Sequence, residues 1–293
     1  MSEDVAERGW FVGLDREDRD GARDAIRSGS ADAPDDWPSL AVESGFADDE
    51  AEYYERLHDA TVAATRAQAT ERERAGDQQL VHAVRAMDDC SRTANELAER
   101  LTEWANALFD ENDSGVGYAR ELVEREPVGP DEERVVSLAG RVVDLADEAD
   151  DLRAYVEARA PDVAPNLSAM AGPVLAGRLI SLAGGLESLA KKPSGTVQVL
   201  GAEDALFAHL RGHASSPKHG IIYTHDAVRG TRREDRGSAA RAVAGKLTIA
   251  ARVDHYSGER KPELDEELRE RIETIQARAE PDEPAAGDGG NDE

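Results

Sequence analysis

Two long stretches of the chain place apolar residues at steps of three or four, the spacing of one helix face. The first stripe runs from Leu80 to Leu108, and the second alternates three and four from Val135 to Val156 without a fault. Asp and Glu occupy the outer positions, as in a seam of heptads. The positions expected in the seam are Leu97, Leu101, Trp104, Leu108, Val135, Leu138, Val142, Leu145 and Leu152.

Gly- and Pro-containing sequence separates the stripes and predicts a long antiparallel helical hairpin, a coiled-coil dimerisation region within residues 51–160. Two core helices of a bundle would produce the same stripes. Few other apolar residues exist to cover such helices, which favours an extended rod that also self-associates. Trp104 is expected to be buried in the seam.

The flanking sequence completes a mainly α prediction. Residues 1–50 read as a small α/β unit, with a short strand at 10–14 and a helix near 22–26. Pro161 and Pro165 end the second arm, and residues 161–260 predict a compact all-helical domain. Residues 261–280 predict a terminal amphipathic helix, and the acidic tail 281–293 is expected to be disordered.

Composition excludes several classes of protein. The single cysteine, Cys90, rules out a disulfide framework and a multi-cysteine metal site, and its place in the stripe predicts a packing role. No run of about 18 apolar residues exists, so no membrane contact is expected. The first ten residues lack the basic and apolar regions of a signal peptide, so a cytoplasmic location is expected.

The charge is strongly negative but unevenly distributed. The 293 residues carry a net charge of -27, and only five of 35 basic residues are Lys. Such a surface is typical of proteins from a very salty cytoplasm, where salt screens self-repulsion, although an ordinary acidic protein of a GC-rich genome would look similar. Residues 161–260 carry 13 basic and 9 acidic residues. This asymmetry predicts an anion-binding domain or a face covered by a partner.

No catalytic motif is present: the sequence lacks a GxSxG elbow, a Walker loop, a GxGxxG turn and an HExxH helix. His209 and His213 stand four apart on a predicted helix, which is the spacing of two metal ligands. No cysteine lies nearby and no carboxylate completes a helical metal motif, so neither a metal nor another cofactor is expected.

A basic surface is the remaining candidate site. Arg229, Arg232, Arg233 and Arg236 lie within eight residues that read as a loop, so their planar donors could converge on phosphate. Arg241 and Lys246 follow on a predicted helix. The helix beginning at Gly201 offers free backbone N–H groups, although Glu203 and Asp204 compete for the same dipole.

Four segments now carry a resemblance to a known family. They are PNLSAMAG (165–172), AGRLISLAGGLESLAKKPSGTVQVLGAEDALFAHLR (176–211), SPKHGIIY (216–223) and GKLTIAARVD (245–254). They resemble the Nop domain, and residues 53–275 resemble the archaeal Nop-domain scaffolds of box C/D guide ribonucleoproteins. The GAE–ALF element followed by PKHG is highly specific.

The resemblance implies a non-catalytic scaffold for guide-directed ribose 2′-O-methylation of ribosomal or transfer RNA. It implies four partners: the guide RNA, a kink-turn-binding subunit that resembles a ribosomal protein, fibrillarin on the N-terminal unit, and a second copy through the coiled coil. S-adenosylmethionine would belong to fibrillarin. The family's RNA and composite-surface contacts map here to Gly201, Ala202, Glu203, Arg211, Lys218 and His219.

The chain departs from the family pattern at three basic positions. Asp204 and Ser238 stand where the family commonly has Lys, and Ala208 stands where it has Arg. The N-terminal unit is also shorter than usual, so its fibrillarin-binding surface is expected to be reduced or differently built. An alternative function is a metal-dependent RNA-processing enzyme that uses His209 and His213. Because salt weakens phosphate contacts, we expect weak binding to naked guide RNA and strong binding to a preformed protein–RNA complex.

Overall fold

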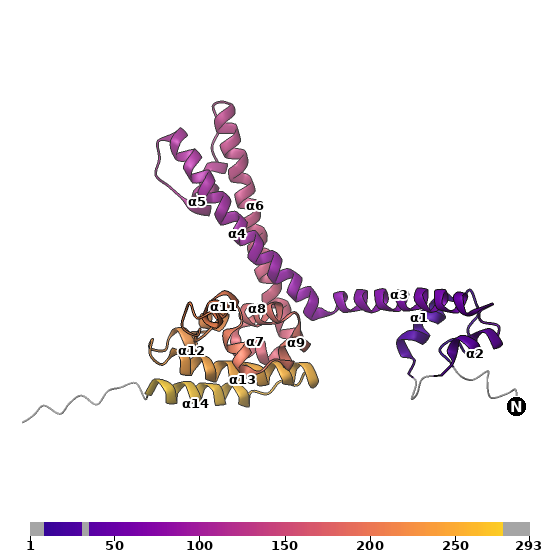
Figure 1. Ribbon diagram of the computed structural model, residues 1–293. Helices are drawn as coiled ribbons and strands as arrows, with labels where there is room; N and C mark the ends of the chain where they lie inside the picture. The colour runs from indigo at the N-terminus through magenta and orange to yellow at the C-terminus, as the bar shows by residue number, and fades with distance from the viewer. Residues whose placement is uncertain (1–8, 31–34, 278–293) are drawn as a thin grey trace, which may run out of the picture. The chain divides into compact units, whose positions relative to one another are not determined.

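The computed structural model describes residues 9–30 and 35–277, and these residues form a mainly α protein of two compact units (Figure 1). The division lies after Ala75 rather than after residue 50, because the helix that begins at Glu50 packs with the helices before it. Within the described ranges no helix is both long and apolar enough to cross a membrane. The acidic tail 281–293 lies outside the described residues.

The first unit contains α1 (Arg19–Ser28), α2 (Trp37–Glu43) and α3 (Glu50–Arg74). An aspartate caps the N-terminus of each helix by accepting a hydrogen bond from a backbone N–H: Asp18, Asp36 and Asp49. Such caps satisfy donors that have no partner within the helix.

The strand expected at residues 10–14 is wrong, and so is the α/β character of this unit in its described part. Residues 10–13 form turns, in which the Leu14 N–H donates to the Phe11 carbonyl at 3.1 Å. Gly13 has a positive φ of 75°, which reverses the chain after a short apolar run and leaves no strand to pair. Trp10 and Phe11 instead turn their rings onto Phe46 and Tyr53 in a small aromatic core.

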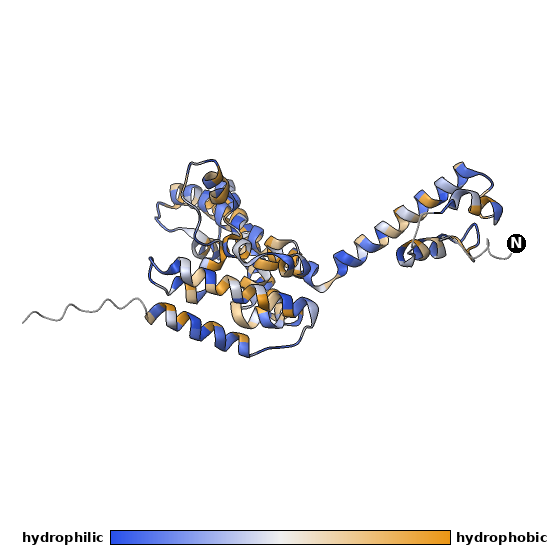
Figure 2. Ribbon diagram, turned by 60° about the horizontal axis from the view of Figure 1, so that its bottom comes forward, coloured by the Kyte–Doolittle hydropathy of each residue, from blue (hydrophilic) through white to orange (hydrophobic). Residues whose placement is uncertain are grey.

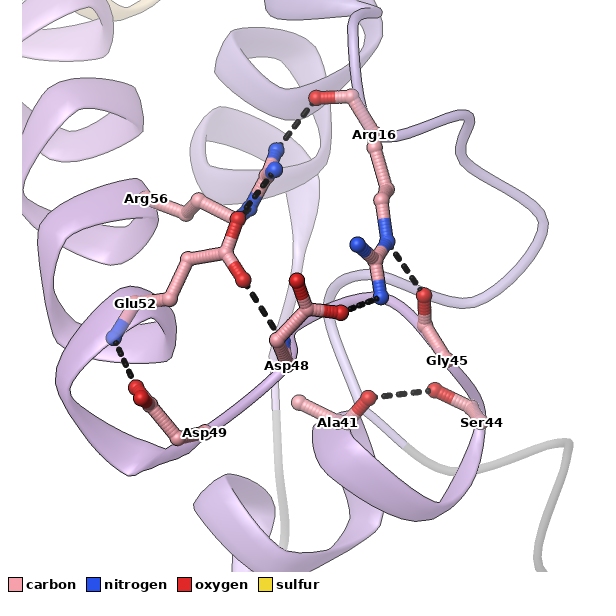
Figure 3. A network of polar contacts seen from close by, with 8 residues as sticks. All are labelled: Arg16, Ala41, Ser44, Gly45, Asp48, Asp49, Glu52 and Arg56. Atoms are coloured by element: carbon pink, nitrogen blue, oxygen red, sulfur yellow. Dashed lines mark hydrogen bonds and ion pairs between the residues drawn. The ribbon is translucent and has the colours of Figure 1, made fainter.

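A polar network joins Arg16, the loop after α2 and the start of α3 (Figure 3). The Arg16 guanidinium donates to Asp48 at 2.7 Å and to the Gly45 carbonyl at 2.5 Å, and it holds the pKa of Asp48 below its usual range. The Asp48 N–H donates to Glu52 at 2.6 Å, which lowers the pKa of Glu52, and Arg56 pairs with the same carboxylate. The network fixes the link between α2 and α3.

The second unit begins with a helical hairpin. Helices α4 (Gly76–Phe109) and α6 (Pro130–Val163) each contain 34 residues, about 51 Å of helix, with α5 (Gly115–Val123) between them. The two helices lie side by side and run in opposite directions, since a Cβ built on Gly76 at the start of α4 would lie 3.5 Å from Val163 at the end of α6. The predicted hairpin is therefore present.

The hairpin seam differs from the predicted one in detail. Leu101, Val135 and Val142 are fully buried, whereas Trp104 is 41% and Leu108 39% exposed, so their expected burial is wrong. Alanines fill much of the contact line and let the helices approach closely, and the long side chains fall on its flank. Buried alanines of the two helices are Ala83, Ala94, Ala98, Ala105, Ala139, Ala149 and Ala160, while the half-buried leucines are Leu97, Leu138, Leu145 and Leu152.

The remaining helices follow the hairpin, and several of them pack against the longest, α13. They are α7 (Pro165–Ala171), α8 (Pro173–Ala183), α9 (Leu186–Lys191), α10 (Ser194–Val199), α11 (Glu203–Leu210), the 3-10 turn η1 (Ile221–Thr224), α12 (Asp226–Arg229), α13 (Arg236–Tyr256) and α14 (Glu263–Ala277). Helix α13 is the centre, and α14 covers it with Leu264, Leu268, Ile272 and Ile275. Figure 2 shows hydrophobic and hydrophilic residues alternating along α14.

The hairpin base and these helices share one hydrophobic core, so residue 160 is not a boundary between compact units. Leu80, Val84 and Val156 of the hairpin pack in the same cluster as Leu179 and Leu247. Gly177 of α8 permits this approach, because a Cβ there would lie 3.0 Å from the Val84 side chain. The Arg178–Asp88 ion pair, at 2.5 Å, joins the same two parts.

Candidate nucleic-acid interface

A shallow groove lies where α10, the segment before η1 and the start of α13 meet. Two of the predicted contacts, Lys218 and Arg241, line it together. Its other lining residues are Gly195, Gln198, Val199, Ser216, Pro217, Glu234, Gly237 and Ser238. The groove thus combines two cations with one carboxylate, Glu234, which lies 3.7 Å from Arg232. Its glycines and serines are small and leave room for a nucleic-acid backbone.

Backbone hydrogen bonds fix the Lys218 segment in place. The Gln198 side chain donates to the Lys218 carbonyl at 2.7 Å, and the Gly220 N–H donates to the Gln198 carbonyl at 2.9 Å. Gly220 lies against the end of α10, where a Cβ would stand 2.0 Å from the Leu200 carbonyl oxygen. Only glycine fits this position, which explains the glycine of the PKHG segment. Gln198 was not predicted, because no motif marks this glutamine in the sequence.

Four predicted cations are exposed and form no side-chain hydrogen bond or ion pair with any residue that the structure describes. They are Arg211, Lys218, Arg233 and Arg241. A guanidinium or ammonium without a carboxylate partner is available for phosphate. In a chain of net charge -27, such groups are the best candidates for contacts with an anion.

The other predicted cations are engaged within the protein. Arg229 pairs with Asp226 at 2.8 Å, Arg232 lies 3.7 Å from Glu234, and Lys246 forms an ion pair with Glu267 of α14. The expectation that Arg229, Arg232, Arg233 and Arg236 share one loop is wrong, because Arg229 ends α12 and Arg236 begins α13. Only Arg232 and Arg233 lie in the loop between the two helices, and the Arg236 guanidinium lies 3.5 Å from the Arg229 carbonyl oxygen.

Arg236 supports the fold and forms a stacked column with two rings. Its guanidinium lies 5.4 Å from the centroid of the Tyr223 ring, and its Nε donates to the Thr231 carbonyl at 3.0 Å. The His219 ring stacks on Tyr223 at a centroid distance of 4.8 Å. His219 is half-buried at the edge of the groove segment, so this column positions it beside Lys218.

Helix α11 stands away from the core. None of its residues is buried, and Phe207 and Leu210 are 57% and 71% exposed. The predicted contacts Gly201, Ala202 and Glu203 lie at its start, where the Glu203 carboxylate accepts the Gly201 N–H at 2.9 Å. This bond occupies a donor that phosphate would otherwise use. The exposed apolar pair was not predicted, although Phe207 is the last residue of the GAE–ALF element.

Among the described residues, no further metal ligand joins the histidine pair. The Nδ1 atom of His209 lies 3.0 Å from the Ala214 carbonyl oxygen, a hydrogen bond that closes the turn after α11. Across residues 9–30 and 35–277, no group of three or more His, Cys, Asp or Glu residues is arranged to hold a metal ion. No feature of the described chain therefore favours the metal-dependent alternative.

Comparison with known proteins gives one family and several relatives. The Nop family model, described as "snoRNA binding domain, fibrillarin", matches residues 80–277. An uncharacterised NOP5 family protein of Methanocaldococcus jannaschii is 37% identical over 236 residues, 68% of this chain and 57% of the relative. Nucleolar protein 58 of Yarrowia lipolytica is 31% identical over 63% of this chain and 43% of its own length.

Human nucleolar protein 56 is 30% identical over 67% of this chain and 40% of its own length, so the chain spans about half the length of these relatives. Among solved structures, a chain from a fibrillarin/Nop5p complex matches with a TM-score of 0.52. That match covers 91% of this chain and 98% of the other. At 23% identity, this likeness concerns the fold alone.

Proposed function

Because the chain belongs to the Nop family, whose model spans residues 80–277, we propose that it is a non-catalytic RNA-binding scaffold of a box C/D guide ribonucleoprotein. The observation that carries the proposal is the groove, where Lys218 and Arg241 stand without carboxylate partners. Cations left unpaired in so acidic a chain are best explained by an anionic ligand.

In this proposal the RNA backbone lies along the groove. Lys218 and Arg241 contact phosphates inside it, and Arg211 and Arg233 contact phosphates at its margins. Ser238 stands where the family commonly has Lys and contributes a hydroxyl hydrogen bond instead of a charge. At high salt the replacement of Lys by Ser costs little RNA affinity, because charges are screened over a Debye length of about 3 Å at 1 M salt.

The kink-turn-binding subunit occupies the exposed face of α11 in the same proposal. Phe207 and Leu210 are apolar, solvent-facing and held on a helix with no buried residue. Burial of such side chains contributes about 1.5–3 kcal/mol each and does not weaken with salt. A protein partner already bound to RNA would therefore supply affinity that phosphate contacts alone cannot provide in a salty cytoplasm.

A second copy of the chain binds one side of the hairpin. Leu97, Trp104 and Leu108 follow one flank of α4, and Leu138, Leu145 and Leu152 follow the equivalent flank of α6. Equivalent flanks of an antiparallel pair lie on the same side. Helix α5 takes the opposite side, where Arg120 pairs with Asp147 at 2.5 Å, two positions after Leu145. The leucine-bearing side is left for self-association.

The N-terminal unit is proposed to bind fibrillarin, which would bring S-adenosylmethionine and the methyl transfer. Its support is the match of the fold to a chain from a fibrillarin/Nop5p complex. The guide RNA would choose ribose 2′-hydroxyls of ribosomal or transfer RNA by base pairing. The methylation would take place in the cytoplasm.

The test is reconstitution with fibrillarin, the kink-turn subunit and a guide RNA at high salt. Methyl transfer to the paired target should require this chain and should fall when both Lys218 and Arg233 are replaced by Ala. The double variant should keep the thermal unfolding of the wild type, because neither side chain has a partner among the described residues. Full methylation without the chain would reject the scaffold role.

A further inference from the structure

One face of α13 is accessible along its whole length and carries no carboxylate. Its residues recur at steps of three or four and therefore share one side of the helix. They are Ser238, Arg241, Gly245, Ile249, Arg252 and Tyr256, which together are called the α13 track. A chain with 62 Asp and Glu residues would be expected to place acidic groups on such a face.

The track begins in the groove and leads away from it. Ser238 and Arg241 line the groove, and Tyr256 is the last residue of α13, about 27 Å further along the helix. Gly245 leaves a saddle between them, because a Cβ built there would meet no atom within 4 Å. A ligand seated in the groove could thus continue over Gly245 and Ile249.

A second group of cations borders the far end of the track. The Arg252 Nε donates to the Ala190 carbonyl at 3.0 Å and fastens the end of α9 to α13. This contact places Lys191 and Lys192, two of the five lysines of the chain, beside the track. Lys191 pairs with Glu187 at 2.5 Å, whereas Lys192 has no ionic partner among the described residues.

Tyr256 ends the track with an unused aromatic surface. Tyr256 is 70% exposed, and its ring meets the His255 ring edge-on at a centroid distance of 4.6 Å. Burial in the protein core does not explain an aromatic residue in this position. Aromatic rings next to cations form the stacking platforms on which proteins hold unpaired bases.

We propose that the α13 track binds an unpaired RNA strand that continues from the groove. A base stacks on Tyr256, while Lys192 and Arg252 contact its phosphates. A single strand fits a track one side chain wide, and Ile249 is the only aliphatic side chain on the track, too little for a protein interface. The proposal goes beyond the scaffold role and rests on it only for the source of the RNA.

The test measures binding of the full chain to a labelled oligouridine of about 12 nucleotides, within the usual site size, and to a blunt RNA duplex of the same length. Tyr256→Ala should weaken oligouridine binding about 5- to 100-fold, the loss expected for one base–aromatic stack. Tyr256→Phe should bind like the wild type. Tyr155→Ala, which removes an exposed tyrosine of α6, is the matched control and should change nothing.

A second pair of variants tests the middle of the track. Ile249→Glu places a carboxylate in the strand's path and should weaken oligouridine binding, whereas Ile249→Gln should have little effect. The proposal would be overturned if wild type, Tyr256→Ala and Ile249→Glu bound oligouridine with equal affinity. The proposal would also be overturned if the variants lost the same affinity for oligouridine and for the duplex, because the ligand would then not be an unpaired strand.

Lys218→Ala separates this proposal from the scaffold role. If Lys218→Ala weakens oligouridine binding while Tyr256→Ala and Ile249→Glu bind like the wild type, the groove is supported and the track is rejected. If Lys218→Ala binds oligouridine like the wild type while Tyr256→Ala and Ile249→Glu bind it more weakly, the result supports the track and counts against the groove.

Discussion

Asn166 and Asp254 form a buried clamp that links three segments of the second unit. Asp254 accepts hydrogen bonds from the Asn166 N–H at 2.9 Å, the Asn166 amide side chain at 2.7 Å and the Leu167 N–H at 2.8 Å. The Asn166 Oδ1 accepts the Lys261 N–H at 2.6 Å. The PNLS and ARVD segments are therefore distinctive because they hold α7, α13 and the link to α14 together.

Asp254→Ala should lower the free energy of unfolding by about 3 kcal/mol, because it strands three N–H groups in a buried site. Denaturant unfolding measures the change. Asp162→Ala is the control, since its carboxylate is exposed and pairs only with Arg159, and it should cost no more than about 0.5 kcal/mol. Equal effects of the two substitutions would contradict a buried clamp.

Tyr118 is the residue whose ionisation the fold suppresses most clearly. Burial raises the pKa of Tyr118 to about 12, and the hydrogen bond that its hydroxyl donates to Glu111 at 2.8 Å acts in the same direction. A pKa raised above the ordinary value of 10 means that this residue's contribution to stability is complete below pH 10 and lost as the pH rises toward 12.

Spectrophotometric titration of wild type and Tyr118→Phe should therefore differ by one tyrosine that ionises near pH 12. Stability measured between pH 10 and pH 12 should also fall less steeply in Tyr118→Phe than in wild type. If the spectral difference between wild type and Tyr118→Phe instead appeared near pH 10, the Tyr118 ring would be exposed to water and the expected burial would be contradicted.

At the scale of elements, the hairpin places small residues at its centre and large ones on its side. Leu101→Ala should cost about 2–5 kcal/mol of unfolding free energy, because Leu101 is fully buried. Trp104→Ala should leave unfolding of the monomer nearly unchanged and should weaken self-association instead. Thermal unfolding and sedimentation measure the two effects. If Trp104→Ala unfolded at a much lower temperature and still associated like the wild type, the assignment of Trp104 to the self-association side would be contradicted.

Sequence periodicity predicted the hairpin but not its covered side, for a physical reason. Apolar stripes identify a helix face, and Leu101 and Leu108 belong to one stripe by spacing alone. Their burial differs because Leu101 packs in one cluster with Ala98 and Ala105, whereas Leu108 lies outside that cluster. The turns near Phe11 could not be predicted for a similar reason. A brief apolar run has the same pattern as a strand, and only its partners in the fold distinguish the two.

At the scale of the whole molecule, charge distinguishes the acidic surface from the groove and its unpaired cations. We propose that the excess of Asp and Glu suits a salty environment and that the chain needs high salt to stay compact, because its carboxylates repel one another. Sequence reasoning located the basic region and four exposed cations. It could not find which arginines pair with carboxylates, because Arg229 and Asp226 meet only once α12 forms.

The most direct test compares binding of the chain to a kink-turn RNA alone and to the same RNA already bound by its protein subunit, across a range of KCl concentrations. The account predicts weak, steeply salt-dependent binding to naked RNA and much tighter, less salt-sensitive binding to the complex, which Lys218→Ala weakens. Equal affinity for the two ligands at every salt concentration would contradict it.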